Sequence, residues 1–563
     1  MEEIKWIVNE VPEGFRTDGG PGALPPILQV LLAQRGYRGP DEIERFLQPR
    51  LAELSDPLEL PGMTGAVERI FRAVDAGEAI CIFGDYDVDG ITSITLLRHI
   101  LRLYGADPRP FIPVRGAEGY GLSDAGIERC LAEGGAPDLL ITVDCGTASA
   151  EQIARLQGEG IDVIVADHHE PGAAGPPPAV AVVNPKVGDD LGYLCSAGVV
   201  FKMAHALLKT RPRDDIDLRD YLDLVAVATI ADIVPLVGEN RLLVRHGLKR
   251  LPQTLNHGLR ALMDVTGMNG HATSADVGFR IGPRINAAGR MDAPEEALKM
   301  LTADSHEVAR ELAGRLDAFN RQRQLTEKEI FNEALKQVEE GFDPEVDPVI
   351  VVGGRNWHPG VVGIVASRLM RYFHRPSFAV AIDDDGLGKG SGRSVEGVSL
   401  VDAIDSCRDV LEGGGGHHMA AGISVREEKL DAFREQFAKY VLENTSAEDR
   451  QPRIHIDAEV PFEQLSLEFL ASYDLLQPFG PGNPQPLFMT RDVWLTEAPR
   501  HLKNKHVKLH LRHGVHERDA IFFGAGDRDL PDPPWDVAFN VDRNVFRGRT
   551  TLQLTVREIR ASR

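Results

Sequence analysis

The chain has 563 residues, enough for about three or four domains that each bury a core. Apolar residues make up 43% and charged residues 26%, which excludes a fibrous or globally disordered protein. A formal net charge of −23 argues against loose binding to nucleic acid or anionic lipid over the whole surface. Any contact with nucleic acid must therefore use local basic patches or bound cations.

Three apolar runs early in the chain each end in acidic or histidine residues, at 79–90, 138–147 and 162–171. Continuous Val/Ile/Leu runs are typical of strands buried on both faces of a parallel sheet. Helical patterns at 92–104 and 148–157 lie between them, which predicts a doubly wound α/β fold. In such folds the ligand site lies at the carboxyl ends of the strands, so we expect the polar residues to share one crevice.

The middle of the chain predicts a long helix followed by a second α/β domain. Residues 304–341 hold apolar residues at three- and four-residue spacings with almost no Gly or Pro, which predicts one helix of about 55 Å. Strands are expected at 348–354 and 377–382, with a helix at 361–372 between them. A glycine-rich segment follows at 413–422.

The end of the chain reads as short alternating strands. A polar stretch at 444–453 precedes candidate strands at 507–512, 520–524, 536–541 and 550–556. This pattern predicts a small β-barrel.

Asp85, Asp87 and Asp89 alternate directly after the first apolar run. Carboxylates this close repel one another, so keeping them ionised at a buried strand end is costly unless a cation is bound. The alternative is a solvated acidic turn in which Gly90 starts a helix.

The second and third runs end in Asp144 and in Asp167-His168-His169. An Asp after a strand is often only a helix cap, and single histidines are often polar fillers. Two adjacent histidines can, however, offer one imidazole to a metal and the other to a substrate.

Asp232 interrupts a mostly apolar segment at 224–238, and a buried carboxylate is tolerated only when it is paired, hydrogen-bonded or metal-bound. We therefore expect five or six aspartates and one or two histidines at one sheet edge. Such oxygen-rich sets favour Mn²⁺ or Mg²⁺ over a structural zinc. Two ions would lie about 3.5–4 Å apart.

Four segments, in this order, resemble the motifs of the DHH phosphoesterase superfamily: FGDYDVDGITS (83–93), VDCGT (143–147), ADHHEP (166–171) and ATIADIVPL (228–236). Further segments resemble the RecJ family of bacterial single-strand-specific DNA exonucleases: CSAGVVFK (195–202), GPRINAAGRM (282–291), NWHPGVVGIVASRL (356–369), SGRSVEGVSL (391–400), GGGGHHMAAG (413–422) and QPFGPGNPQPLF (477–488). The resemblance covers the chain from about residue 75 to its end.

The resemblance implies a domain order. It gives a DHH catalytic domain at 75–303, a connecting helix at 304–341, a DHHA1 domain at 342–450 and an OB-fold nucleic-acid-binding domain at 451–563. Residues 1–74 are expected to be an extension packed on the catalytic domain.

The resemblance also implies metal ligands. Asp87 and Asp89 match the metal-binding pair, Asp144 the carboxylate that bridges both ions, and His168 and Asp232 ligands of the second ion. Asp85 is expected to complete the first ion, because Phe83 stands where related pyrophosphatases place a histidine.

Asp167 and His169 are the expected catalytic residues. By the resemblance, His169 contacts the scissile phosphate as an acid or as a hydrogen-bond donor. The alternative is that it only supports His168.

Phosphate contacts are expected from the glycine-rich segments. The resemblance makes Arg393 and His417 DNA contacts, and bare N–H groups near Gly414, Gly415 and Gly416 are predicted to form an anion nest in an ordered loop. The alternative is a flexible linker. Further candidates lie in a second predicted loop, where arginines could instead cap carbonyls: Arg280, Arg284, Asn286 and Arg290. Arg284 is the first candidate for a terminal-phosphate pocket, because a guanidinium binds phosphate bidentately.

The segment 499–518 carries six Lys and Arg residues against one Glu. Alternation places Lys508 and Arg512 on the strand face opposite Leu509, which predicts a surface that follows single-stranded DNA. The alternative is an ordinary solvated strand face.

The expected function is thus a single-stranded-DNA-specific 5′→3′ exonuclease of repair and recombination that uses two divalent ions, Mn²⁺ or Mg²⁺. Two alternatives are a DHH-family phosphodiesterase or pyrophosphatase for small substrates and a non-catalytic DNA-binding scaffold. The resemblance suggests single-strand-binding protein and a RecQ-type helicase as partners.

The five cysteines form no Cys-x-x-Cys pair, and the sequence shows no signal peptide or apolar run of about 18 residues. We therefore expect a cytoplasmic monomer without a membrane partner.

Overall fold

The computed structural model describes residues 4–12, 24–119, 121–172, 175–188, 191–268, 270–341, 343, 346–503, 505–526, 528–546 and 548–562. The chain divides into two compact units. The first holds Asp56–Asp232 and Gly247–Pro452, and the second holds Ile4–Ser55, Ile233–His246 and Arg453–Arg563. Among the described helices, none combines the length and the hydropathy needed to cross a bilayer.

The predicted doubly wound domain is confirmed as a parallel five-stranded sheet of order β3-β2-β4-β5-β6. Its strands are β2 (Ile80–Gly84), β3 (Arg109–Phe111), β4 (Leu139–Val143), β5 (Asp162–Ala166) and β6 (Ala181–Val183). Every residue of β2 and β4 is buried, as expected for apolar runs covered on both faces. The strand order reverses between β2 and β4, so the crevice at their carboxyl ends is the expected ligand site.

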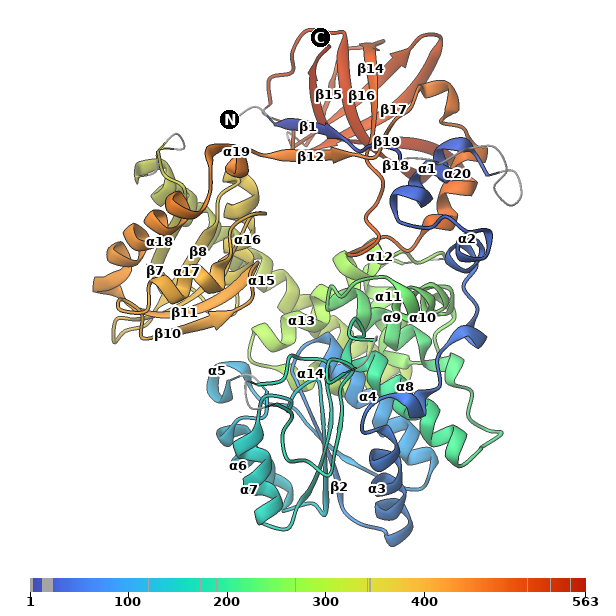
Figure 1. The fold of residues 1–563 in the computed structure, drawn as a ribbon, viewed down its shortest axis with the longest axis vertical. Helices are drawn as coiled ribbons and strands as arrows, with labels where there is room; N and C mark the ends of the chain where they lie inside the picture. Colours follow the sequence, from blue (N-terminus) through green and yellow to red (C-terminus); the bar gives the residue numbers. More distant parts are fainter. Residues whose placement is uncertain are drawn as a thin grey trace. The chain divides into compact units, whose positions relative to one another are not determined.

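Helices cover both faces of this sheet (Figure 1). One face carries α6 (Asp124–Gly134) and α7 (Ala150–Gly158), whose Ile127 and Ile153 pack on Phe83 of β2. The other face carries α3 (Met63–Ala76), α4 (Val88–Leu103) and α8 (Ser196–Thr210). The apolar helix α9 (Leu222–Ala231) packs on α4 and α8 and is buried over most of its length.

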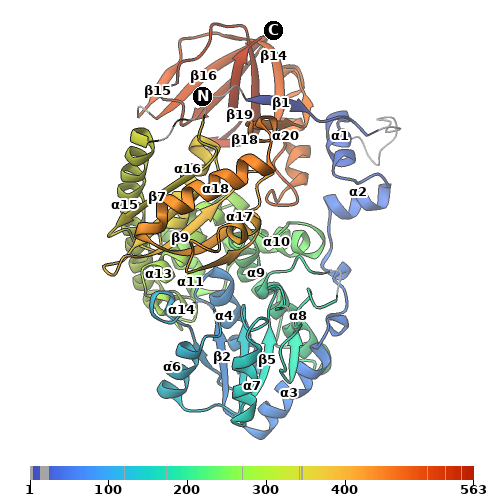
Figure 2. The ribbon, with the colours of Figure 1, turned by 60° about the vertical axis from the view of Figure 1, so that its left-hand side comes forward.

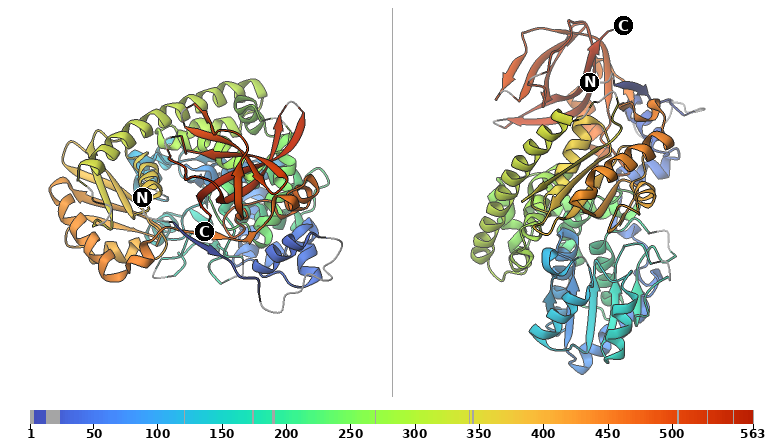
Figure 3. Two further views of the ribbon diagram at one scale, coloured as in Figure 1. Left: turned by 90° about the horizontal axis from the view of Figure 1, so that it is seen from above. Right: turned by 90° about the vertical axis from the view of Figure 1, so that its left-hand side faces the viewer.

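The predicted long helix is confirmed as α15 (His306–Gly341), the continuous yellow-green helix in Figure 3. It packs against α11 (His257–Thr266), α13 (Gly282–Arg290) and α14 (Pro294–Leu301) of the catalytic domain. Ile330, Phe331 and Val338 of the same helix lie in a core with the next domain. One helix therefore belongs to the cores of both domains.

The second α/β domain has a five-stranded sheet of order β10-β11-β9-β8-β7. Its strands are β7 (Ile350–Arg355), β8 (Ser377–Ile382), β9 (Leu387–Arg393), β10 (Gly413–Gly416) and β11 (Ala420–Arg426). Helix α16 (Val362–Phe373) and α15 cover one face, and α17 (Leu400–Ser406) and α18 (Leu430–Asn444) cover the other (Figure 2).

The second unit contains the predicted β-rich domain. Its sheet has the order β13-β14-β18-β19-β17-β16-β15, and β14 also pairs with β16. The strands are β13 (Ala458–Glu459), β14 (Phe488–Leu495), β15 (Arg500–Leu502), β16 (His506–His513), β17 (His516–Phe523), β18 (Trp535–Phe546) and β19 (Arg549–Ala561).

The expectation for residues 1–74 needs correction. Residues 4–55 belong to the unit of the C-terminal strands, not to the catalytic domain. Strand β1 (Lys5–Val8) pairs with β12 (Arg453–Ile456), and helices α1 (Pro26–Gln34) and α2 (Pro40–Leu47) contribute to the barrel core. Only the part of the extension around α3 packs on the catalytic sheet, through β6 and α8.

Two segments that were predicted to be loops form regular secondary structure instead. The glycines at 413–416 form the edge strand β10, in which Gly416 alone has a positive φ (+145°), so the predicted loop was wrong. Residues 280–290 lie in a π-helix (Val277–Ile281) and in α13. Buried apolar positions on both segments, such as Ile285 and Ala421, hold them against the core, which outweighs the preference of glycine for loops.

Candidate metal centre and phosphate site

The first acidic group is fixed by a tight turn after β2. Asp85 follows the strand and is 1% exposed, and Asp87 caps α4 by accepting hydrogen bonds from the N–H groups of Asp89 (2.9 Å) and Gly90 (3.1 Å). A Cβ at residue 90 would lie 2.4 Å from the carbonyl oxygen of Asp85. The turn that brings the three carboxylates together therefore requires Gly90.

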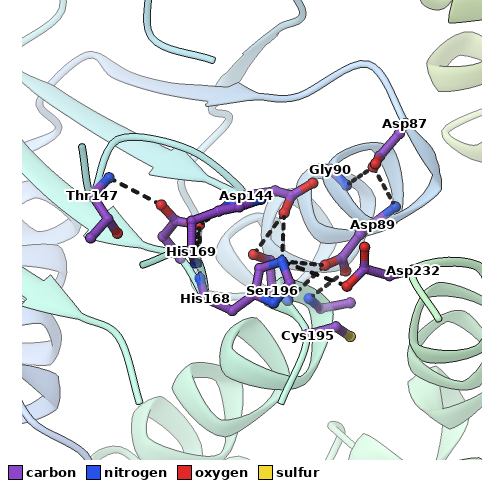
Figure 4. A network of polar contacts seen from close by, with 12 residues as sticks. Asp87, Asp89, Gly90, Asp144, Thr147, His168, His169, Cys195, Ser196 and Asp232 are labelled. Atoms are coloured by element: carbon purple, nitrogen blue, oxygen red, sulfur yellow. Dashed lines mark hydrogen bonds and ion pairs between the residues drawn. The ribbon is translucent and has the colours of Figure 1, made fainter. Parts of the chain in front are cut away.

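Asp144 occupies the neighbouring strand end. It follows β4 with a φ of +61°, a left-handed conformation that non-glycine residues rarely adopt. Its N–H donates to the carbonyl of Ala166 at the end of β5 (3.1 Å). This strained backbone turns the carboxylate toward the crevice (Figure 4), and such strain is concentrated at functional sites.

His168 lies among three of the predicted carboxylates. Its Nε2 is 3.5 Å from Asp144 Oδ1, 3.6 Å from Asp232 Oδ2 and 3.9 Å from Asp89 Oδ2. Asp232 reaches this point from the C-terminal end of α9, so one predicted ligand comes from a helix and not from the sheet edge. Figure 4 shows these side chains converging.

Within the described ranges of the chain, three groups of side chains have ligand atoms within 4.8 Å of one another. They are Asp85 with Asp87 and Asp144, Asp89 with His168 and Asp232, and Asp144 with His168 and His169. All six predicted metal ligands therefore belong to these groups. Asp144 and His168 each belong to two of them, and of these two only the Asp144 carboxylate has two oxygens that could contact different ions.

Several of the converging atoms have no hydrogen-bond partner in the described part of the chain. They are Asp85 Oδ1, His168 Nε2 and Asp232 Oδ2, and all three are buried. Leaving a buried polar atom unpaired costs about 1–3 kcal/mol, more for a charged group. Bound cations would satisfy all three atoms, so the residues fit hard divalent metal ions.

The carboxylates repel one another where no cation lies between them. Burial and then the charge of Asp87 raise the pKa of Asp89 to about 7, and burial and then Asp89 raise the pKa of Asp232 to about 9. Burial raises the pKa of Asp85 and of Asp144 well above the ordinary value. Burial, followed by the neighbouring His169, lowers the pKa of His168 to about 4, so that its imidazole is neutral and can act as a ligand.

Asp167 has a different place in this geometry, because it belongs to none of the three groups but contacts His169 and accepts from the N–H of His168 (2.7 Å). Its Oδ1 lies 2.7 Å from His169 Nδ1, and its Oδ2 accepts from the N–H of Thr147 (3.0 Å). Burial alone would raise the pKa of Asp167 and lower that of His169, but their hydrogen bond and the attraction between their opposite charges together outweigh burial and shift both in the opposite direction. The contact therefore favours a carboxylate beside a protonated imidazole.

Unpaired arginines lie where the catalytic and second α/β domains meet. Within the described residues, Arg115, Arg290 and Arg393 form no ion pair, and Arg290 donates to the carbonyl of Gly360 (2.8 Å). Burial and then the charge of Arg115 lower the pKa of Arg290 to about 10. Clustered cations without a carboxylate are expected where a phosphate binds.

The other predicted DNA contacts on α13 and the π-helix are engaged in structural interactions. Arg284 Nε donates to Asp317 (2.9 Å), and Arg280 Nη1 donates to Asp276 (3.0 Å). Asn286 accepts from the N–H of Val88 at the start of α4 (3.2 Å). Arg284 is thus ion-paired, which weakens the case for it as a terminal-phosphate ligand.

The predicted basic face of β16 is confirmed as a strand face. Val507, Leu509 and Leu511 are buried on the opposite side. Lys508 Nζ lies 3.5 Å from Asp519 of β17, so part of its charge is neutralised. Arg512 donates to the carbonyl of Gly514 (3.3 Å) and lies opposite the half-exposed Trp494 of β14.

Gly414, Gly415, Gly416 and His417 are placed on or next to the edge strand β10. Gly415, Gly416 and His417 are exposed. An edge strand leaves one row of its N–H and C=O groups unpaired, so these residues can still meet a phosphate backbone.

Sequence reasoning assigned no role to several residues of the site. Asn184 Nδ2 donates to the carbonyl of His169 (2.8 Å) and to Thr147 Oγ1 (2.9 Å), and Ser196 Oγ donates to Asp144 (3.0 Å). Arg115 follows β3. Ser196 lies in CSAGVVFK (195–202), one of the segments that carry the family resemblance, but no role was attached to it. For Asn184 the signal was a polar residue close to a buried apolar segment, which occurs throughout the chain.

Comparisons with known proteins agree with this geometry. Family models match residues 79–229 (DHH family, N-terminal domain), 347–443 (DHHA1 domain) and 456–558 (RecJ OB domain). The single-stranded-DNA-specific exonuclease RecJ of Bacillus subtilis is 36% identical over 95% of this chain and 68% of its own length.

Solved structures give the same result. RecJ of Thermus thermophilus in complex with Mn²⁺ has a TM-score of 0.85 and 33% identity, and the match covers 100% of this chain and 80% of that chain. The Mg²⁺ complex from the same organism has a TM-score of 0.79 and 32% identity, covering 100% and 79%.

Proposed function

This chain belongs to the RecJ family of single-stranded-DNA-specific exonucleases, and from that premise we propose that it degrades single-stranded DNA from the 5′ end. The products are 5′-mononucleotides, the cofactors are two Mn²⁺ or Mg²⁺ ions, and the role is in DNA repair and recombination. The observation that carries the proposal is the set of buried atoms that have no hydrogen-bond partner among the described residues, which lie after β2, after β5 and at the end of α9.

The carboxylates and His168 would hold the ions. One ion fits the group of Asp85, Asp87 and Asp144, and the other fits the group of Asp89, His168 and Asp232, with Asp144 shared. Bound ions supply charge stabilisation for the phosphoryl group and lower the pKa of an attacking water. The protein's own contribution is to hold these side chains close together against their mutual repulsion.

His169 supplies a proton donor at the same place. Its Nδ1 is held by Asp167, which fixes the orientation of the ring. The Asp167 carboxylate raises the pKa of His169 and so favours the protonated imidazole, which can donate a hydrogen bond or a proton to a phosphate oxygen.

A terminal phosphate is best accommodated by the unpaired arginines. Arg393 and Arg290 come from different domains of the first unit, and the positive charge of Arg115 acts on both of them. A 5′-phosphate carries more charge than an internal phosphodiester, so a cluster of guanidinium groups would prefer a strand end. We therefore move the end-binding role from Arg284 to Arg393 and Arg290.

The C-terminal β domain would hold the rest of the strand. Arg512, the exposed residues Arg500 and Lys505, and Trp494 provide positive charge and an aromatic surface of the kind that binds single strands without sequence preference. A hydrolase for small substrates has no need of such a domain, and a non-catalytic scaffold has no need of a complete set of ligands. Both alternatives are therefore disfavoured.

Family membership also suggests single-strand-binding protein and a RecQ-type helicase as partners, a monomeric state and a cytoplasmic location. Size-exclusion chromatography with light scattering tests the monomer. Co-purification with each candidate partner tests the interactions.

The experiment for end recognition compares single strands with a 5′-phosphate and a 5′-hydroxyl. The wild type should degrade the phosphorylated strand faster, and Arg393→Ala should shrink this preference. Arg355→Ala is the matched control, because Arg355 is an exposed arginine of the same domain that is already paired with Glu427. If Arg393→Ala slows both substrates by the same factor, Arg393 does not bind the terminal phosphate.

A further inference from the structure

The first turn of helix α8 holds Asp89 from outside the helix that carries it. The N–H of Ser196 donates to Asp89 Oδ2 (2.7 Å), and the N–H of Ala197 donates to Asp89 Oδ1 (2.8 Å). Both carboxylate oxygens therefore accept from the N-terminal end of α8, where the helix dipole favours negative charge. The position and plane of the Asp89 carboxylate depend on α8 as well as on α4.

The same serine also contacts Asp144, a candidate ligand that belongs to different groups from Asp89. Ser196 Oγ donates to Asp144 Oδ1 (3.0 Å), and Figure 4 shows Ser196 between Asp89 and Asp144. Asp89 belongs to one group of candidate ligands, and Asp144 belongs to the other two. Ser196 is 0% exposed, so no water competes for these contacts.

The hydrogen bond donated by the Ser196 hydroxyl differs from those donated by two other buried hydroxyl groups of the domain. Thr92 and Thr229 donate to carbonyls one turn back in their own helices, at 2.7 Å in both cases. Such a bond pairs the hydroxyl with a carbonyl of its own helix and does not connect the helix to another element. The Ser196 hydroxyl instead reaches a carboxylate at the end of β4.

We propose that Ser196 is a positioning residue that sets the spacing of Asp89 and Asp144, so that the affinity for both ions depends on its hydroxyl. The inference rests on the proposed function, because it takes these aspartates as metal ligands. In Ser196→Ala the backbone N–H still holds Asp89, but Asp144 loses its donor and can rotate. Loss of a hydrogen bond to a metal ligand typically weakens metal binding by about 10–100-fold.

The test measures Mn²⁺ binding without DNA, by calorimetry and by the electron paramagnetic resonance signal of free Mn²⁺. Ser196→Ala should bind Mn²⁺ about 10–100-fold more weakly than the wild type. Ser196→Thr, which keeps a hydroxyl, should restore most of the affinity. Ser377→Ala is the matched control, because Ser377 is also 0% exposed but its hydroxyl donates to the carbonyl of Arg375 in the second α/β domain (2.8 Å).

Melting temperatures separate positioning from a merely structural role. With chelator, Ser196→Ala should melt close to the wild type, whereas the rise caused by Mn²⁺ should be smaller. Wild-type Mn²⁺ affinity in Ser196→Ala overturns the inference. If Ser196→Ala does not fold, Ser196→Cys and Ser196→Thr are compared, and equal Mn²⁺ affinity in these two overturns it.

The outcomes also distinguish this inference from the proposed function. If the wild type binds two Mn²⁺ ions but leaves single-stranded DNA intact, the proposed function fails while the role of Ser196 stands. If the wild type does not bind Mn²⁺, both fail.

Discussion

Replacing Asp232 by Asn removes one charge from the metal centre and keeps the shape of the side chain. In the metal-free protein, burial and then Asp89 hold the pKa of Asp232 at about 9, against about 3.9 for a free Asp. Because the folded-state pKa is raised, the folded protein must hold a proton that the unfolded chain releases. The resulting loss of stability grows as the pH rises from about 4 to about 9, and at pH 7 it reaches at most about 4 kcal/mol.

Asp232→Asn should therefore be more stable than the wild type in chelator at pH 7 and much less active with Mn²⁺. A gain of 1 kcal/mol raises the melting temperature by about 2–4 °C in a domain of this size, so we expect an increase of several degrees. The increase should shrink at pH 5. With saturating Mn²⁺ the order should reverse, and kcat should fall at least about 100-fold, or about 3 kcal/mol.

Asp223→Asn is the control for this comparison. Asp223 lies on the same helix, is 1% exposed, and burial raises its pKa to about 6, but it belongs to none of the three groups of candidate ligands. Its replacement should leave kcat and the Mn²⁺-induced rise in melting temperature unchanged. A lower melting temperature of Asp232→Asn in chelator, together with more than about a tenth of wild-type kcat, would refute the reasoning.

Three further predictions concern the ions and the strand. Asp144→Ala should abolish hydrolysis but leave single-strand binding measurable by fluorescence anisotropy, and more than about a tenth of wild-type kcat would show that Asp144 is not shared by the ions. Mn²⁺ affinity should rise between pH 6 and 9, because Asp89 and Asp232, with pKa values near 7 and 9, must lose protons; calorimetry in two buffers that detects no proton release would contradict this. The double variant Arg500→Ala, Arg512→Ala should bind long single strands more weakly and with a shallower salt dependence, and an unchanged slope would exclude this face as the strand-binding surface.

Strand binding by the C-terminal β domain is better tested by these substitutions than by deleting residues 455–563. Helices α1 and α2 share the core of the C-terminal strands through Leu28, Leu31 and Phe46. A deletion would expose these side chains to water and favour aggregation. Changes on the strand surface avoid that consequence.

The convergence of the candidate metal ligands was predictable because its signals are local. Asp85, Asp144 and His168 each follow a buried apolar run, and parallel strands bring their carboxyl ends to one edge. Asp232 was recognised because burying a carboxylate within an apolar segment costs free energy, although this residue lies at the end of a helix and not of a strand. Each apolar run and the polar residues that follow it lie within a short stretch of sequence. Their convergence can therefore be predicted without knowledge of the tertiary structure.

Long-range pairing was not predictable in the same way. Lys5 pairs with Arg453 in a two-stranded parallel sheet, and nothing within either segment specifies the other. The partner of Arg284 is also distant in the sequence, because Asp317 lies on α15. Whether an arginine is free or paired decides its function, and that depends on packing between elements.

The prediction for the glycines at 413–416 failed for a physical reason. Glycine permits a nest but does not require one, and Gly414 pairs with Ile423, whose buried side chain anchors β11 in the sheet. The apolar segment that follows the glycines determined the conformation.

The most direct test of the central claim is the degradation of one single-stranded oligonucleotide labelled separately at its 5′ and 3′ ends. With Mn²⁺, we expect the 5′ label to appear at once as a mononucleotide, while the 3′ label stays in fragments that shorten with time. Duplex DNA of the same sequence should persist, and chelator should stop the reaction. Immediate release of the 3′ label as a mononucleotide would contradict the account. So would internal cleavage fragments from both the 5′-labelled and the 3′-labelled strand.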